Sequence, residues 1–238
     1  MDLASAPAAH VDAMKAAKGV SIYSRSINRP VGKALATLAC RARLSANAVT
    51  VASALLTTGA LAVLVLFRPA VLSGVAVAAL LALGYAFDAA DGQVARMSGT
   101  TSSSGEWLDH VVDAGKVVAV HSVVLVAWFR FDIESGAWLA LPLVFQLIAV
   151  VTFSALTTVG LLKRLQTARP PSTGASLRRA LALLPADYGV LCWTFVLWGS
   201  PDAFRYVYLI LCVLNAVTMV AFLVKWFGEL VDGDRTGS

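Results

Sequence analysis

Residues 71–130 read VLSGVAVAALLALGYAFDAADGQVARMSGTTSSSGEWLDHVVDAGKVVAVHSVVLVAWFR, which is two apolar runs joined by a polar, acidic stretch. Each run approaches the roughly 20 apolar residues that an α-helix needs to cross a membrane. Because the join is short, the two helices are expected to be antiparallel neighbours. The runs are continuous and do not alternate between apolar and polar residues, as the strands of a membrane β-barrel would.

The composition of the whole chain agrees with this pattern. Of its 238 residues, 58% are hydrophobic and only 14% are charged, whereas a soluble domain has about 45–50% apolar and about 25% charged residues. This excludes an ordinary cytosolic enzyme, a disordered chain and a coiled coil. The sequence therefore predicts an all-α fold, a polytopic membrane helical bundle.

Six transmembrane helices are expected, each from a mostly apolar run of about the required length. They cover residues 45–67, 71–88, 105–129, 138–162, 181–198 and 206–227. An N-terminal amphipathic surface helix is expected within residues 20–40, where Ile27, Val31 and Leu35 recur near the helical period between basic residues. Such a pattern is typical of a helix that lies on the membrane surface.

The basic residues indicate how the bundle is oriented. The chain has 19 Lys and Arg against 14 Asp and Glu, and with six spans only Arg68, Arg130 and Arg205 lie on one side. Cytoplasmic loops carry the excess of Lys and Arg, so both termini are expected to be cytoplasmic, in an inner or plasma membrane. The expected organisation is a cytoplasmic N-terminus with the surface helix (1–44), a transmembrane domain (45–227) and a cytoplasmic tail (228–238). Topology accounts for the net charge, and no nucleic-acid partner is expected.

Four carboxylates lie in the stretch that joins the second and third spans. Asp88 and Asp91 are three residues apart, and Asp109 and Asp113 are four apart. These spacings place side chains on one helix face, so two antiparallel neighbours can direct all four at one place. Clustered anions repel one another, and one or two bound divalent cations would remove that penalty. Oxygen ligands without a nearby Cys or His cluster favour Mg²⁺, with Mn²⁺ or Ca²⁺ as alternatives.

Small residues and one cation accompany the carboxylates. Gly92, Ala95 and Gly105 leave room for a ligand or another backbone, and Arg96 adds a cation of the kind that clamps phosphates. Together they indicate a metal-bound diphosphate and phosphoryl transfer. A divalent-cation transporter could use the same carboxylates. However, transporter sites usually lie near the bilayer midplane, whereas these lie at one membrane face.

The same stretch resembles the signature of the CDP-alcohol phosphotransferase (CDP-alcohol phosphatidyltransferase) family, D-x2-D-G-x2-A-R-x8-9-G-x3-D-x3-D. The six-span plan and the N-terminal surface helix are also similar to that family. All eight signature positions match, and they are Asp88, Asp91, Gly92, Ala95, Arg96, Gly105, Asp109 and Asp113.

The resemblance implies a role for each matched position. The four aspartates would hold two metal ions, and Asp113 would also be the general base that activates the acceptor hydroxyl. The three small residues would admit the cytidine nucleotide, and Arg96 would contact its phosphates. The family's Asn-x-x-Thr pattern at the start of the first span is matched by Asn47 and Thr50, as further nucleotide contacts, although Ala46 stands where a proline is usual.

The implied reaction, in phospholipid synthesis, is attack by an alcohol hydroxyl on the diphosphate of a CDP-linked donor, with release of CMP. The donor is expected to be CDP-diacylglycerol. The alternative is transfer of a choline- or ethanolamine-like head group to a lipid alcohol, the branch that residues 102–106 with Asp109 and His110 resemble. Phosphatidylinositol-phosphate synthases of the family usually have an arginine directly after the last aspartate. Ala114 stands there in this chain, which argues against that activity. The resemblance also implies membrane lipids and a second copy of the chain, in a homodimer, as partners.

Other polar residues near the motif have two interpretations each. His110 could orient a neighbouring ligand or act as an alternative base, or it could be an interfacial hydrogen-bonded residue. Lys116 could neutralise the acidic cluster or contact a phosphate. Asp187 could bind the acceptor or pair with a buried cation such as Lys116. Three basic residues that follow the fourth span could bind an acceptor or lipid phosphate, or could reflect topology alone. They are Lys163, Arg164 and Arg169.

Overall fold

The structure, a computed structural model, describes residues 21–166 and 183–237, and within these ranges all regular elements are helical. The longer helices are α2 (Arg29–Arg41), α3 (Ala46–Leu66), α4 (Val71–Met97), α5 (Ser103–Arg130), α6 (Ala140–Gln166), α8 (Tyr188–Thr194) and α9 (Pro201–Gly237). The short elements are η2 (Ser24–Asn28), η3 (Gly136–Leu139), η4 (Leu184–Ala186) and η5 (Phe195–Gly199).

Local sequence explains where the two site-bearing helices begin and end. Helix α4 continues past Asp88 to Met97 because Ala, Gln, Arg and Met are good helix formers, and it stops where Gly99 adopts φ 64°. The N–H of Thr100 then donates to the carbonyl of Ala95 at 2.9 Å, which satisfies the helix end. Ser102 begins α5 by accepting the N–H of Gly105 at 3.1 Å. Asp88 therefore lies within α4, whereas the sequence predicted that the second span ends at this residue.

Within the described residues, five helices are long and apolar enough to cross a membrane, namely α3, α4, α5, α6 and α9. This agrees with the expected helical membrane bundle. The sixth expected span, residues 181–198, corresponds to a shorter apolar helix over Tyr188–Gly199. Residues 181 and 182 of the expected span lie outside the described ranges. The count of six spans therefore stays a prediction.

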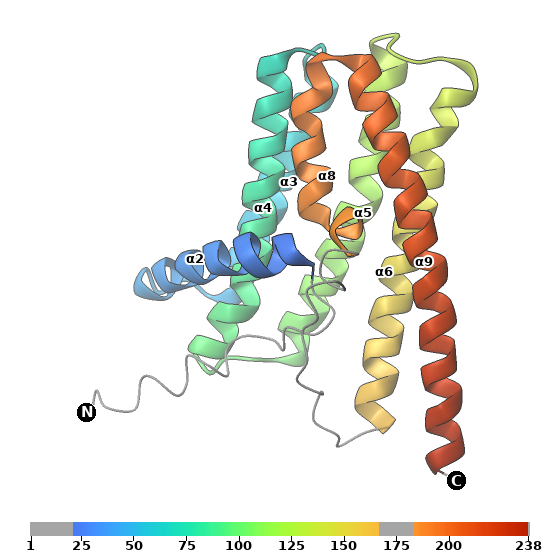
Figure 1. Cartoon of the computed structure of the whole chain (residues 1–238). Coiled ribbons are helices and arrows are strands. Elements are labelled where there is room, and N and C mark those ends of the chain that lie inside the picture. Colours follow the sequence, from blue (N-terminus) through green and yellow to red (C-terminus); the bar gives the residue numbers. More distant parts are fainter. Residues whose placement is uncertain (1–20, 167–182, 238) are drawn as a thin grey trace.

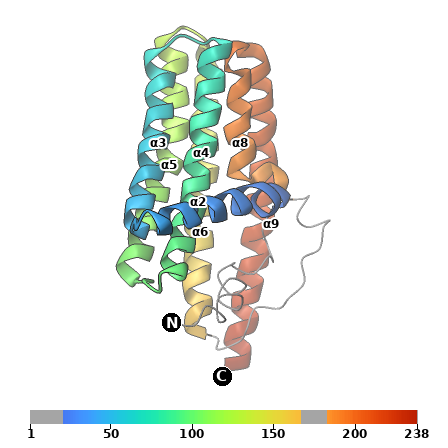
Figure 2. The same ribbon diagram turned by 90° about the vertical axis from the view of Figure 1, so that its left-hand side faces the viewer.

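Helix α2 crosses the C-terminal half of α4, partway along the bundle, and α6 and α9 extend well beyond the crossing (Figure 1, Figure 2). Small residues make the crossing close: a Cβ at Gly32 would lie 3.0 Å from the Cβ of Ala89, and Ala36 is fully buried. The larger apolar side chains of Ile27 and Val31 are exposed. That this face lies on the membrane surface stays a prediction.

Aromatic side chains fill the opposite end of the bundle. Trp128 of α5, Trp198 of η5 and Phe204 of α9 are buried there, with Trp198 and Phe204 in edge-to-face contact at 4.9 Å between ring centroids. Arg205 binds both carboxylate oxygens of Glu134 at 2.9 and 3.1 Å. The large cavity described below lies away from this aromatic cluster.

Gly189 provides a test of how η2 is held against α8. A Cβ on Gly189 would lie 2.0 Å from Cε1 of Tyr23, and the Tyr23 hydroxyl accepts a hydrogen bond from Trp193 Nε1 at 3.0 Å. Gly189→Ala should therefore displace Tyr23 and destabilise the fold by about 1–3 kcal/mol, measured as a lower thermal unfolding midpoint in detergent.

Gly59→Ala is the matched control for this change. Gly59 lies within α3, and no atom lies within 4 Å of its ideal Cβ. Alanine there should leave the midpoint unchanged or slightly higher, since it is the better helix former. Equal shifts in the two variants would show that the contact between Tyr23 and Gly189 does not hold the two segments together.

Candidate active site

A cavity of about 1100 Å³ lies among η2, α4, α5, α6, α8 and α9. All four aspartates of the motif line it, from the C-terminal part of α4 and the N-terminal part of α5. Arg96 and Gly92 also line it from α4. The cavity thus combines a cluster of acidic groups with apolar side chains of α6 and α9, among them Phe153, Leu156 and Phe222, and charged residues of both helices also line it.

Three of the four aspartates converge. Asp88 of α4 and Asp109 and Asp113 of α5 each offer a carboxylate oxygen, and these oxygens lie within 4.8 Å of one another. Helices α4 and α5 run antiparallel after a short loop, but both pack on α3 rather than closely on each other. The carboxylates meet across the space between α4 and α5. Oxygen-only donors at this separation fit a hard divalent cation.

Asp91 is held differently, by α3. Its Oδ2 accepts the hydroxyl of Thr50 at 2.7 Å, its Oδ1 accepts the N–H of Gly92 at 2.5 Å, and only 5% of the residue is exposed. Helix α3 can approach this closely because Gly84 faces it: a Cβ there would lie 3.0 Å from Oγ1 of Thr57. The sequence pattern predicted four equivalent carboxylates, whereas the structure groups three and places Asp91 beside them.

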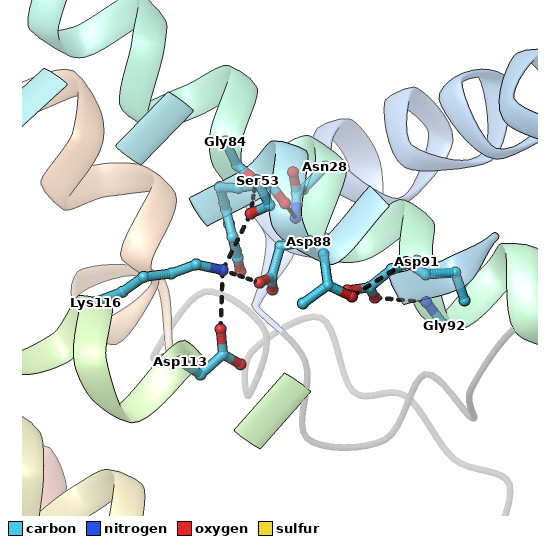
Figure 3. A network of polar contacts seen from close by, with 11 residues as sticks. Asn28, Ser53, Gly84, Asp88, Asp91, Gly92, Asp113 and Lys116 are labelled. Carbon is cyan, nitrogen blue, oxygen red and sulfur yellow. Dashed lines mark hydrogen bonds and ion pairs between the residues drawn. The ribbon is translucent and has the colours of Figure 1, made fainter. Parts of the chain in front are cut away.

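Lys116 reaches into the acidic cluster, as Figure 3 shows. Its ammonium forms an ion pair with Asp88 and lies 3.0 Å from Oδ1 of Asp113 and 3.0 Å from Oγ of Ser53. Of the interpretations open for Lys116, neutralisation of the cluster is the one that these contacts match.

Asp187 does not pair with Lys116, contrary to one of the sequence expectations. It accepts the N–H of Gly189 at 2.7 Å and so caps α8. It also accepts the hydroxyl of Ser21 and the N–H of Ser24, the latter at 3.3 Å. Since its neighbours are donors from η2 and α8, Asp187 joins these two elements at the cavity wall.

The small residues of the motif lie beside the groups expected to bind the nucleotide. A Cβ at Gly92 would lie 3.3 Å from Nη1 of Arg96, and one at Gly105 would lie 3.4 Å from Oδ1 of Asn47. The absence of a side chain at Gly92 lets the Arg96 guanidinium lie over α4. Its absence at Gly105 lets Asn47 approach the start of α5. Their nucleotide contacts, and those of Ala95 and Thr50, stay predictions.

The remaining candidates are more peripheral. His110 lines the cavity, and its Nε2 lies 3.8 Å from Oε1 of Glu106 with both side chains partly exposed. Lys163 lines the cavity between α6 and α9 and forms an ion pair with Glu229. The Arg164 side chain and Arg169 lie outside the described part of the chain.

Sequence reasoning missed several residues around the cavity. Ser53 was not singled out, although the buried polar series Thr50, Ser53 and Thr57 recurs at helical spacing in α3 and could have indicated a polar face. Arg29 also lines the cavity, and its carbonyl accepts from Nε2 of Gln93 at 3.4 Å. Burial lowers the pKa of the Arg29 guanidinium, yet arginine remains a cation in proteins. It therefore adds positive charge beside Arg96.

The fold and the acidic cavity define an integral membrane protein with a polar site built between its helices, of the kind suited to an enzyme that acts on lipids. A family model described as CDP-alcohol phosphatidyltransferase matches residues 43–226. The chain therefore belongs to the CDP-alcohol phosphatidyltransferase family and is a transferase of phospholipid synthesis.

The fold is shared with a solved relative. The chain is similar to the crystal structure of Mycobacterium tuberculosis phosphatidylinositol phosphate synthase with CDP-DAG bound, with 23% sequence identity, a TM-score of 0.55, and coverage of 84% of this chain and 94% of that one. No curated protein sequence matches the chain. At this identity the structural likeness supports the fold alone.

Proposed function

We propose that the protein is a metal-dependent transferase that moves a phosphatidyl group from CDP-diacylglycerol to an alcohol hydroxyl and releases CMP. The observation that carries this proposal is the convergence of Asp88, Asp109 and Asp113 within 4.8 Å in a large cavity. A donor such as the CDP-DAG bound to the mycobacterial neighbour has both a diphosphate for such a site and acyl chains for the apolar walls.

The donor set fits Mg²⁺ or Mn²⁺, because all ligands are carboxylate oxygens and no Cys lies among them. Asp88, Asp109 and Asp113, with Asp91 beside them, would hold one or two ions. When bound, the metal neutralises the donor diphosphate and the charge that develops on it.

In the proposed reaction, the acceptor oxygen forms a bond to the phosphorus that carries the diacylglycerol. The bond from that phosphorus to the bridging oxygen breaks, and CMP leaves with the bridging oxygen. Asp113 accepts the proton of the acceptor hydroxyl. Arg96 orients the phosphates through charge-assisted hydrogen bonds. In the metal-free protein, Lys116 pairs with Asp88 and Asp113 and also binds Ser53. His110 is the less favoured base because it lies beside Glu106, outside the three-carboxylate cluster.

We also propose that the site opens at the cytoplasmic face. Arg68, Arg130 and Arg205 lie around the aromatic end of the bundle, in or beside the α3–α4, α5–α6 and η5–α9 connections, whereas α2 and the acidic cavity lie towards the other end. The excess of basic residues at that other end favours the cytoplasm.

The test of the proposed function is CMP release by the purified protein in detergent or lipid discs. With CDP-diacylglycerol, Mg²⁺ and a panel of alcohols, we expect CMP and a new phospholipid in equal amounts, identified by mass spectrometry. EDTA should abolish both, and excess Mg²⁺ should restore them.

The same assay separates the alternatives. CDP-choline or CDP-ethanolamine with diacylglycerol replaces the donor in a parallel reaction, and turnover there alone would assign the head-group branch. Divalent-cation flux into liposomes without any nucleotide turnover would instead support a transporter and would contradict the proposal.

A further inference from the structure

Lys116 occupies a cation site that the protein itself builds. An ammonium has three N–H donors, and three acceptors surround this one: Asp88 Oδ1, Asp113 Oδ1 at 3.0 Å and Ser53 Oγ at 3.0 Å (Figure 3). Ser53 donates its own hydroxyl hydrogen to the carbonyl of Gly84 at 2.7 Å, so a lone pair of its oxygen faces the ammonium. The Lys116 side chain is only 11% exposed.

This arrangement is more than a helix-surface ion pair. Lys116 and Asp113 are three residues apart on α5, and such a pair alone contributes little when exposed. Here the same ammonium also binds Asp88 on α4 and Ser53 on α3. It therefore connects three helices at the point where the carboxylates meet.

The carboxylates that bind Lys116 are also those expected to bind the metal. Asp88 and Asp113 both belong to the three-carboxylate cluster. A divalent ion held by these oxygens would face the ammonium at short range in a partly buried site, where like charges repel more strongly than in water. Metal binding must therefore weaken or displace contacts of Lys116.

We propose that Lys116 is a resident counter-ion of the metal site: it stabilises the metal-free protein by pairing with Asp88 and Asp113, and it lowers the affinity for divalent cations by competing for those carboxylates. It is a positioning residue, because it acts through the two aspartates. This inference rests on the proposed metal site.

The test compares Mn²⁺ binding to wild type and Lys116→Met, after removal of metals and without nucleotide, by electron paramagnetic resonance of free Mn²⁺. Methionine keeps the length of the side chain and removes its charge. Because this change removes a like charge beside the metal ligands in a partly buried site, we expect Mn²⁺ to bind about tenfold more tightly to Lys116→Met, or about 1.4 kcal/mol. Its metal-free thermal midpoint should fall, and the rise in midpoint on adding Mn²⁺ should exceed that of wild type.

Three further variants sharpen the test. Lys116→Arg should bind Mn²⁺ about as tightly as wild type does, because it keeps the charge. Lys33→Met, which removes an exposed lysine of α2, should change nothing. Ser53→Ala removes one acceptor of the ammonium and should raise Mn²⁺ affinity about threefold in the wild-type background, but not in the Lys116→Met background. Ser53→Ala also carries the test if Lys116→Met does not fold.

The outcomes distinguish this inference from the proposed function. Unchanged or weaker Mn²⁺ binding in Lys116→Met, with normal binding in wild type, overturns the competition and leaves the metal site standing. If neither wild type nor Lys116→Met binds Mn²⁺, both the inference and the metal-dependent function are wrong. An equal gain from Ser53→Ala in both backgrounds also overturns the inference, because Ser53 would then act without Lys116.

Discussion

Asp113→Asn is expected to lose turnover while the protein still binds its CDP-linked donor. The amide has nearly the shape of the carboxylate but cannot accept the proton of the acceptor hydroxyl, and general-base catalysis contributes about 10²–10⁴-fold. We therefore expect kcat to fall about 10³-fold. The amide oxygen can still accept from Lys116, so the helix contacts should persist. CMP release under single-turnover conditions measures the first effect, and equilibrium binding of CDP-diacylglycerol measures the second.

Asp132→Asn is the matched control. Asp132 is exposed in the α5–α6 connection at the opposite end of the bundle and has φ 52°, a left-handed conformation that asparagine also tolerates. This variant should be indistinguishable from wild type. Normal turnover in Asp113→Asn would remove the base assignment, and a large loss confined to His110→Ala would transfer that role to His110.

The sequence predicts the helical architecture well because hydrophobic runs of membrane length carry strong signals. It also predicts that acidic residues on two antiparallel helices meet, since the spacing within each helix and the short loop between them are local features. The convergence of Asp88, Asp109 and Asp113 agrees with this prediction, but α4 and α5 are held in place through α3, on which both pack. Helix ends were less predictable, because the polar stretch after Asp88 is itself helix-compatible and α4 continues to Met97.

Contacts that depend on a third helix could not be predicted from spacing. The pairing of Asp91 with Thr50 requires α3 to pack closely on α4, which Gly84 permits. The packing of α3 on α5 brings Ser53 to Lys116. Nothing in the local sequence distinguishes Asp91 from Asp88, so the motif alone makes the carboxylates look equivalent.

Asp91→Ala tests whether the carboxylate held by α3 also serves the metal. If Asp91 is a ligand, its loss should raise the Mg²⁺ concentration needed for half-maximal binding of CDP-diacylglycerol at least about tenfold, since metal affinity depends this strongly even on groups that only support the ligands. The Thr50 hydroxyl keeps a second acceptor in the carbonyl of Ala46 at 3.2 Å, so α3 should remain in place. The measurement is a Mg²⁺ titration of donor binding, with the metal-free thermal midpoint recorded alongside.

Asp202→Ala is the control for this titration, because it removes a carboxylate that is 80% exposed and pairs with Arg205 at the far end of the bundle. It should leave the Mg²⁺ dependence unchanged. If Asp91→Ala shows the same Mg²⁺ dependence as wild type, the metal is held by the three converging carboxylates, and Asp91 is a structural link to α3. A fall in the metal-free midpoint with an unchanged titration would lead to the same conclusion, since a ligand and a packing residue differ in which of the two readouts they move.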